Sequence, residues 1–172
     1  MGQHIEALRI RPLRAEETPP YELLLLADPS KPLVDAYLSA GTCHVAELGG
    51  ETIGVFVLLE KHAGTLEIMN IAVAERYQGR GFGQALLAEA VEEARRRGAV
   101  FMEIGTGNSG FQQLYLYQKC GFRMVAIDHD FFVRNYEEPI VENGIPCRDM
   151  VRLRMALTEA PGESSVRGHA HD

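Results

Sequence analysis

Apolar side chains recur along this chain with two different periods, which separate predicted strands from predicted helices. In the first part the pattern predicts a short strand, two helical stretches and three more strands: Leu8–Arg11, Ala15–Ala27, Pro32–Ala40, Thr42–Leu48, Thr52–Glu60 and Thr65–Val73. Gly49-Gly50-Glu51 is typical of a hairpin turn. Helices and strands then alternate: Arg80–Arg97, Val100–Thr106, Phe111–Lys119, Phe122–Asp128 and Met150–Leu157. This order predicts an α/β fold, with a mixed sheet and helices on its faces.

The segment Arg80–Arg97 is the clearest predicted helix. Its apolar side chains fall on one face at spacings of three and four: Phe82, Leu86, Ala90, Val91 and Ala94. Gly98 suits the left-handed position that follows a helix, and the preceding arginines suit the negative end of the helix dipole. We therefore attribute these arginines to helix structure and not to anion binding.

Length and composition fit one globular domain. The 172 residues are 46% hydrophobic and 24% charged, which supplies a core and excludes global disorder. We expect the domain to span residues 1–157 and residues 158–172, rich in Gly, Ser, Glu and His, to form a disordered tail. His169 and His171 in this tail have no third ligand nearby, so we assign no metal site.

Charge and cysteine content exclude several classes of protein. Seventeen Lys and Arg against 24 Asp and Glu give a formal net charge of −7, so nucleic acid and membrane are not expected as partners. Residues 1–10 lack the features of a signal peptide, and no apolar run is long enough to span a membrane, so we expect a cytoplasmic protein. Cys43, Cys120 and Cys147 are widely spaced and indicate free thiols.

A glycine-rich turn, Arg76-Tyr77-Gln78-Gly79-Arg80-Gly81-Phe82-Gly83, joins the strand ending at Val73 to the long helix. Alternate glycines leave room for a ligand, and the first N–H groups of a helix have no partner within it. Together with the helix dipole, Arg76 and Arg80 favour an anion such as a pyrophosphate. Gln84 and Leu86 break the GxGxxG dinucleotide pattern, and the segment has no P-loop ending. A connection without a ligand is the alternative.

Two segments resemble motifs of the GNAT superfamily of N-acyltransferases. Asn70-Ile71-Ala72-Val73 with Gln78-Gly79-Arg80-Gly81-Phe82-Gly83 is similar to the family's strand and acyl-CoA pyrophosphate loop, Q/R-x-x-G-x-G/A. Leu116-Tyr117-Gln118-Lys119-Cys120-Gly121-Phe122 is similar to the L-Y-x-K-x-G-F segment that ends its next helix. The resemblance covers roughly residues 8–157. It implies a mostly antiparallel sheet, flanked by helices, with a central pair of parallel strands that splay apart.

The resemblance further implies transfer of an acetyl group from acetyl-CoA to a primary amine of a small-molecule or peptidic acceptor, in a ternary complex. A bulge in Thr65–Val73 would let the Ile71 amide polarise the thioester carbonyl while Val73 pairs with the pantetheine arm. The implied cofactor-binding residues are Ile71, Ala72, Val73, Gln78, Gly79, Arg80, Gly81, Phe82, Gly83 and Asn108. Many members place an Asn where this chain has Gly110; Asn108 either replaces it or is a turn residue, with Ser109 as the helix N-cap.

An acid and a base are also implied. The attacking amine must lose a proton, and Glu67 interrupts an apolar strand at a position where some members carry a base. Apolar neighbours would suit that role, and a strand-end Glu facing water is the alternative. Tyr117 matches the Tyr that protonates the departing thiolate; a core residue is its alternative. Tyr115 lies about 200° around the helix, so the two tyrosines do not share a face.

The acceptor side is less defined. Between Asp128 and Met150 a long connection carries aromatic and acidic residues: Phe131, Phe132, Tyr136, Glu137, Glu138, Glu142 and Asp149. They predict either an acidic, aromatic-walled pocket for a cationic amine or a self-packed surface loop. The acceptor, the acyl chain and the oligomeric state stay open, a homodimer included. A non-catalytic acyl-CoA-binding or regulatory domain is the alternative function, and a nucleotide-binding module comes third.

Overall fold

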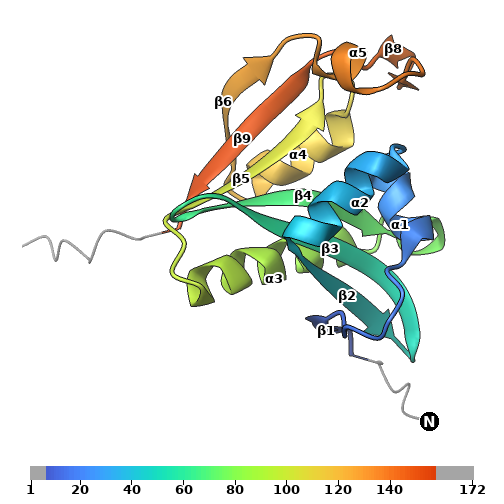
Figure 1. Ribbon diagram of the computed structural model, residues 1–172, viewed down its shortest axis with the longest axis vertical. Coiled ribbons are helices and arrows are strands. Elements are labelled where there is room, and N and C mark those ends of the chain that lie inside the picture. The colour runs from blue at the N-terminus through green and yellow to red at the C-terminus, as the bar shows by residue number, and fades with distance from the viewer. Residues whose placement is uncertain (1–6, 158–172) are drawn as a thin grey trace, which may run out of the picture.

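A computed structural model describes residues 7–157 of the chain. The fold consists of strands β1 to β9 and helices α1 to α5 (Figure 1). The strands are β1 Arg9–Pro12, β2 Thr42–Leu48, β3 Glu51–His62, β4 Thr65–Val73, β5 Phe101–Gly107, β6 Arg123–Asp128, β7 Val141–Glu142, β8 Ile145–Pro146 and β9 Met150–Ala156. The helices are α1 Tyr21–Ala27, α2 Lys31–Ala40, α3 Phe82–Arg96, α4 Phe111–Lys119 and α5 Phe131–Asn135, with a 3-10 turn η1 at Glu75–Tyr77. The predicted tail and its histidines lie outside the described residues.

One mixed sheet carries the molecule. Its strand order is β1-β2-β3-β4-β5-β9-β6, and β7 and β8 form a separate small hairpin. Every neighbouring pair in the large sheet is antiparallel except β4 and β5, which are parallel. The predicted α/β class, with a mostly antiparallel sheet and one parallel pair, is therefore confirmed.

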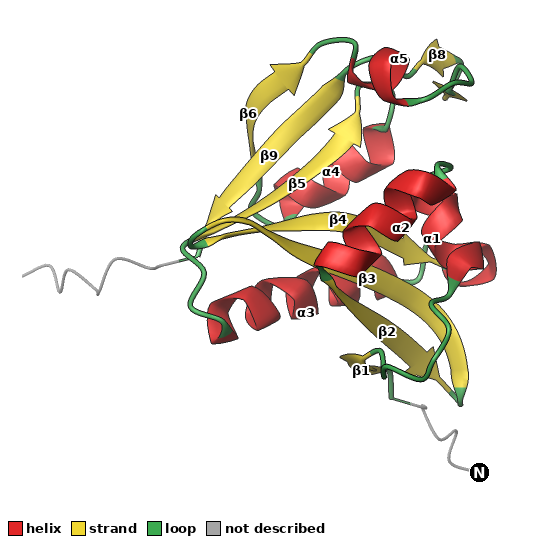
Figure 2. Ribbon diagram, in the orientation of Figure 1, coloured by secondary structure: helices red, strands yellow, loops and turns green. Residues whose placement is uncertain are grey.

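Each face of the sheet is covered by its own helices (Figure 2). On one face, α3 buries the stripe Leu86, Leu87 and Ala90 against the sheet in a core shared with α4. On the other face, α1 and α2 bury Leu24 and Val34 against β3. Burying one apolar stripe per helix is what fixes these helices on the sheet.

The structure corrects two predicted helix boundaries and one predicted loop. The first helix begins at Tyr21 and not at Ala15, because the Pro19-Pro20 pair disfavours helix in the residues before it. The long helix begins at Phe82 and not at Arg80, because Gly81 is left-handed, with φ of 84°. The connection after Asp128, expected as a loop, contains α5 and the β7–β8 hairpin.

The parallel pair splays apart, as the resemblance implied. β4 and β5 pair only from Thr65 with Phe101 to Ile68 with Ile104, and the strands then diverge (Figure 1). β4 also carries a bulge: Ile68 faces Leu58 and Asn70 faces Val57, which leaves Met69 as the extra residue. The edge of β4 that faces β5 is therefore unpaired from residue 69 to residue 73.

Among residues 7–157 no helix combines the length and apolarity needed to cross a membrane.

Candidate active site

A cleft of about 250 Å³ opens where β4 and β5 diverge. Seven of the predicted site residues line it: Ile71, Ala72, Val73, Gln78, Gly79, Gly83 and Tyr117. Sequence reasoning missed five further lining residues: Leu26 and Ala27 of α1, and Gln112, Gln113 and Leu116 of α4. The α1 residues carry no motif, and their place depends on how α1 packs on β4. The glutamines follow the position where the family's Asn was sought, which was their only signal.

The glycine-rich turn presents unpaired backbone donors beside the cleft. The N–H groups of residues 79–84 have no hydrogen-bond acceptor among the described residues. Gly79 and Gly81 adopt φ of 76° and 84°, a conformation that favours glycine. The Gln78 side chain donates to the Val73 carbonyl at 2.9 Å, which fixes the turn to the end of β4. The turn can therefore hold an anion on backbone donors at a helix N-terminus.

The two arginines of this turn differ in their surroundings. Arg76 forms an ion pair with Glu51, so its charge is compensated within the protein. Arg80 has no ion-pair partner among the described residues and lies over the ring of Tyr77, with 5.5 Å between the guanidinium carbon and the ring centroid. Of the two cations expected beside an anion, only Arg80 keeps an uncompensated charge. Arg80, Gly81 and Phe82 border the turn but are not among the cleft's lining residues.

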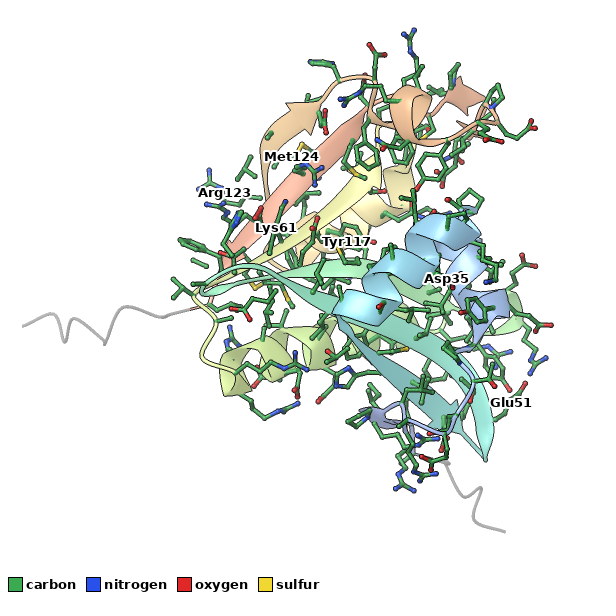
Figure 3. All side chains as sticks on the ribbon, viewed as in Figure 1. Asp35, Glu51, Lys61, Tyr117, Arg123 and Met124 are labelled. Atoms are coloured by element: carbon green, nitrogen blue, oxygen red, sulfur yellow. The ribbon has the colours of Figure 1, made fainter. Side chains whose placement is uncertain are left out.

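Tyr117 is buried and lines the cleft. Figure 3 labels it near the place where β4 and β5 diverge. Only 5% of the residue is exposed, yet its hydroxyl makes no hydrogen bond to a described residue. Burial raises the pKa of Tyr117 above its ordinary value, and the charge of Glu142 adds to this effect. The hydroxyl is therefore a protonated donor with a free hydrogen. Tyr115 is 67% exposed, which agrees with its predicted position on the other side of the helix.

Glu67 lies outside the cleft lining and has charged neighbours. It is 8% exposed, and its carboxylate lies 3.3 Å from Arg152 Nη1 and 3.7 Å from Lys61 Nζ. Arg152 also lies 3.6 Å from Asp128 and 5.7 Å from the centroid of the Phe131 ring. The expectation that apolar neighbours surround this carboxylate is wrong, because two cations lie beside it: Lys61, six residues away in sequence, and Arg152, 85 residues away.

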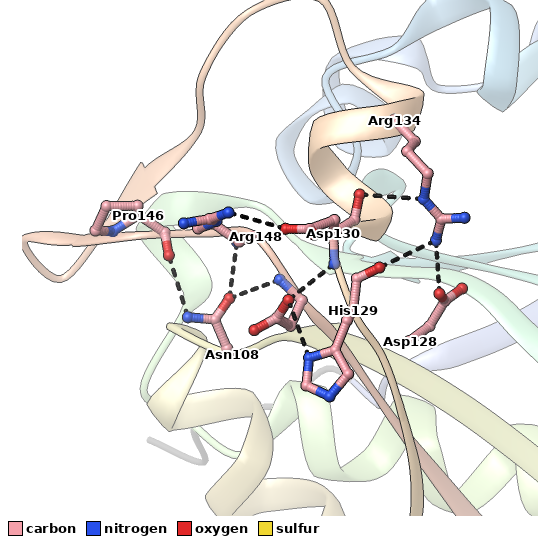
Figure 4. Close-up of polar contacts among 8 residues, drawn as sticks. Asn108, Asp128, His129, Asp130, Arg134, Pro146 and Arg148 are labelled. Atoms are coloured by element: carbon pink, nitrogen blue, oxygen red, sulfur yellow. Dashed lines mark hydrogen bonds and ion pairs between the residues drawn. The ribbon is translucent and has the colours of Figure 1, made fainter.

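Asn108 organises the segment before β9 (Figure 4). Its side-chain oxygen accepts hydrogen bonds from the backbone N–H groups of Arg148 and Asp149, and its side-chain nitrogen donates to the Pro146 carbonyl at 3.1 Å. It is not among the residues that line the cleft. The pantetheine contact of Asn108 stays a prediction, and the turn role is the one that these hydrogen bonds describe. The N-cap of α4 is Gly110 and not Ser109.

The aromatic side chains of the segment from His129 to Asp149 pack on one another. Phe132 contacts Phe131 and Tyr136, with ring centroids 5.1 and 5.4 Å apart. Two of its acidic residues pair with basic ones of the same segment, Asp130 with Arg148 and Asp149 with His129 (Figure 4). The structure thus favours the self-packed segment over the acidic pocket, and none of these residues lines the cleft.

A chain of hydrogen bonds runs from this segment to the bulge of β4. Tyr136 donates to Asp28 at 2.8 Å, and Tyr37 donates to the other oxygen of Asp28 at 3.1 Å. Asn70, beside the bulge, donates to the Tyr37 hydroxyl at 2.8 Å and to the Leu24 carbonyl at 2.9 Å. The chain therefore links α5, α1 and α2 to the residue directly before Ile71.

Within residues 7–157 no group of His, Cys, Asp and Glu side chains is arranged to hold a metal ion.

The splayed parallel pair, the cleft and the open amides at the start of α3 define the class of acyltransferase that the sequence motifs resemble. The model of the acetyltransferase (GNAT) family matches residues 6–122. The uncharacterized N-acetyltransferase YvbK of Bacillus subtilis (strain 168) is 60% identical over 137 residues, which cover 80% of this chain and 88% of that protein.

Two solved structures share the fold at high identity. A GNAT family acetyltransferase from Elizabethkingia anophelis with acetyl-CoA bound is 49% identical, with a TM-score of 0.86 over 87% of this chain and 98% of that one. A Bacillus subtilis acetyltransferase in complex with CoA is 57% identical, with a TM-score of 0.83 over 88% of this chain and 100% of that one. The chain belongs to the GNAT family and is an acetyltransferase.

Proposed function

We propose that this protein transfers the acetyl group of acetyl-CoA to a primary amine by direct attack in a ternary complex. The observation that carries the proposal is the cleft between β4 and α4, which ends at a turn with six successive unpaired N–H groups. Such a turn suits a pyrophosphate, and an unpaired strand edge suits an extended chain of amides. The two relatives with bound acetyl-CoA and CoA support the same ligand.

In this proposal the backbone does most of the binding. The N–H groups of residues 79–84 hold the pyrophosphate, with Arg80 beside them. The free edge of β4 pairs with the pantetheine arm at Val73, and the Ile71 amide polarises the thioester carbonyl. Because hydrogen bonds from a preorganised backbone need no rearrangement, they stabilise the oxyanion as it forms.

Side chains handle the protons. Tyr117 donates a proton or hydrogen bond to the departing thiolate, and its raised pKa keeps it protonated at neutral pH. Glu67 accepts the proton of the amine. About 13 Å of strand separates Glu67 from Ile71, at 3.3 Å per residue. We therefore place at least one water molecule between the carboxylate and the amine.

The first test is calorimetric titration with acetyl-CoA. We expect micromolar binding, equivalent to about 8 kcal/mol, and its loss in a Gly81→Glu, Gly83→Glu variant whose carboxylates repel the pyrophosphate. Gly98→Glu at the other end of α3 is the control for the change at Gly81, because Gly98, like Gly81, has positive φ and open space around it. Equal binding by all three proteins would contradict the assignment of the turn.

The second test separates catalysis from binding alone. A protein that binds acetyl-CoA should acetylate at least one member of a panel of amines, followed by release of free thiol. Binding without transfer across small amines and peptide N-termini would favour the non-catalytic acyl-CoA-binding alternative. Tight ATP binding without acetyl-CoA binding would favour the nucleotide-binding alternative.

A further inference from the structure

Gln113 is a lining residue of the cleft with an amide oxygen that lies near Gly110. Its side chain lines the cleft together with that of Tyr117, four residues later, so the two lie one turn apart on one face of α4. Oε1 of Gln113 is buried and has no hydrogen-bond partner among the described residues. A buried oxygen without a donor is unfavourable, and a ligand that brings an N–H group relieves this cost.

Gly110 makes room for this side chain. A Cβ atom at position 110 would lie 3.1 Å from Gln113 Oε1 and 2.7 Å from Thr106 Oγ1, so a larger residue would displace one of them. Position 110 is also where the family resemblance placed an Asn. Gln113 lies three residues after this position, in the first turn of α4.

The opposite wall indicates what Gln113 contacts. It is formed by Ile71, Ala72 and Val73, on the edge of β4 that β5 leaves unpaired. A ligand held along such an edge is an extended chain with amide groups of its own. The pantetheine arm of CoA has two amides, the nearer one two methylene groups from the sulfur. This places an N–H group close to the sulfur atom that Tyr117 faces in the proposed function.

We propose that Gln113 accepts a hydrogen bond from an amide N–H of the pantetheine arm and so fixes the arm against β4. This inference rests on the proposed function, in which acetyl-CoA occupies the cleft. Its effect is on ligands that carry the arm. The nucleotide and pyrophosphate of CoA bind at the turn of residues 79–84 and do not need Gln113.

The experiment compares two probes: acetyl-CoA, and adenosine 3′-phosphate 5′-diphosphate, which is CoA without the pantetheine arm. Gln113→Met keeps the length of the side chain and its helix preference but removes the amide group that would accept the hydrogen bond. We expect it to weaken acetyl-CoA binding roughly tenfold and to leave binding of the nucleotide within about twofold. Gln118→Met is the matched control on the same helix. Gln118 is exposed and bonded to the Leu114 carbonyl, so both affinities should stay as in wild type.

The outcomes separate this inference from the proposed function. If wild type binds acetyl-CoA and Gln113→Met binds it equally well, Gln113 does not contact the arm. An equal loss for both probes also overturns the inference, because the change would then act on the whole site. If wild type itself does not bind acetyl-CoA, the proposed function fails and this inference fails with it.

Discussion

Glu67 and Glu103 form a natural pair for comparison. They face each other in register on β4 and β5, with 8% and 6% of each residue exposed. Each lies beside an arginine, at 3.3 Å from Arg152 and 3.7 Å from Arg154. Glu67 alone lies on the strand whose end lines the cleft. A difference between variants of the two residues therefore reports on catalysis and not on the charge balance of the sheet.

We expect Glu67→Gln to lower kcat on the order of 100-fold at neutral pH, because the amine loses its proton acceptor. Gln has nearly the same shape and keeps a hydrogen bond to Arg152, so the Kd of acetyl-CoA should not change. Glu103→Gln should stay within about twofold of wild type. Steady-state kinetics with calorimetry checks both. Turnover by Glu67→Gln at the wild-type rate, or an equal loss in both variants, would exclude Glu67 as the base.

Tyr117→Phe removes only a hydroxyl that makes no hydrogen bond to a residue within 7–157. We expect kcat to fall roughly 10- to 100-fold, because the departing thiolate loses its donor, while the thermal midpoint stays within about 2 °C. Tyr115→Phe, at an exposed position of the same helix, should retain full activity. Activity and thermal unfolding measured on both variants distinguish a proton donor from a core residue. A stability loss in Tyr117→Phe with unchanged kcat would instead indicate a core residue.

At the scale of elements, local sequence predicted the strands, α3, α4 and the glycine-rich turn, because their periodicity and turn residues act over short distances. Gly98 takes the left-handed conformation that its position after the helix predicted, with φ of 73°. Helix α5 and the β7–β8 hairpin were not predicted, since these short elements depend on tertiary contacts such as that of Phe132 with Tyr136. Arg152, the arginine beside Glu67, was missed for the same reason, because it is 85 residues away in sequence.

The candidate site was predictable where it is made of backbone. Gly79, Gly81 and the end of β4 are recognisable because turn geometry and a free strand edge leave a pattern in the sequence. Gln113 leaves only its nearness to the position where the family carries an Asn, because a polar residue on an amphipathic helix is otherwise expected to face solvent. Only its position relative to Gly110 and the cleft shows that its oxygen is enclosed.

At the scale of the molecule, the sheet has two arms that diverge from the paired part of β4 and β5. Asp28 at the end of α1 and Tyr136 after α5 come from different arms, 108 residues apart, and their hydrogen bond joins the arms on the α1 side of the sheet. Burial and the neighbouring Asp28 raise the pKa of Tyr136. The hydroxyl therefore stays protonated, and the bond persists, across the neutral and mildly alkaline range.

We expect Tyr136→Phe to destabilise the protein by about 1 to 2 kcal/mol, because the half-buried Asp28 carboxylate loses a donor. Urea unfolding measures this loss, and hydrogen exchange should show faster opening of residues 131–136 than of α3. The same change at Tyr115, which forms no hydrogen bond through its hydroxyl with a described residue, should alter neither reading. Unchanged exchange in Tyr136→Phe would mean that aromatic packing alone holds α5.

The cleft has walls from both faces of the sheet. Leu26 and Ala27 belong to α1 on one face, and Gln113 and Tyr117 belong to α4 on the other, so side chains from both faces of the sheet line the cleft. If acetyl-CoA and the amine acceptor enter such a cleft from opposite faces of the sheet, they do not obstruct each other. In the proposed reaction, CoA and the acetylated acceptor can then dissociate in either order. Slow dissociation of CoA would delay the next turnover but would not retain the acetylated acceptor.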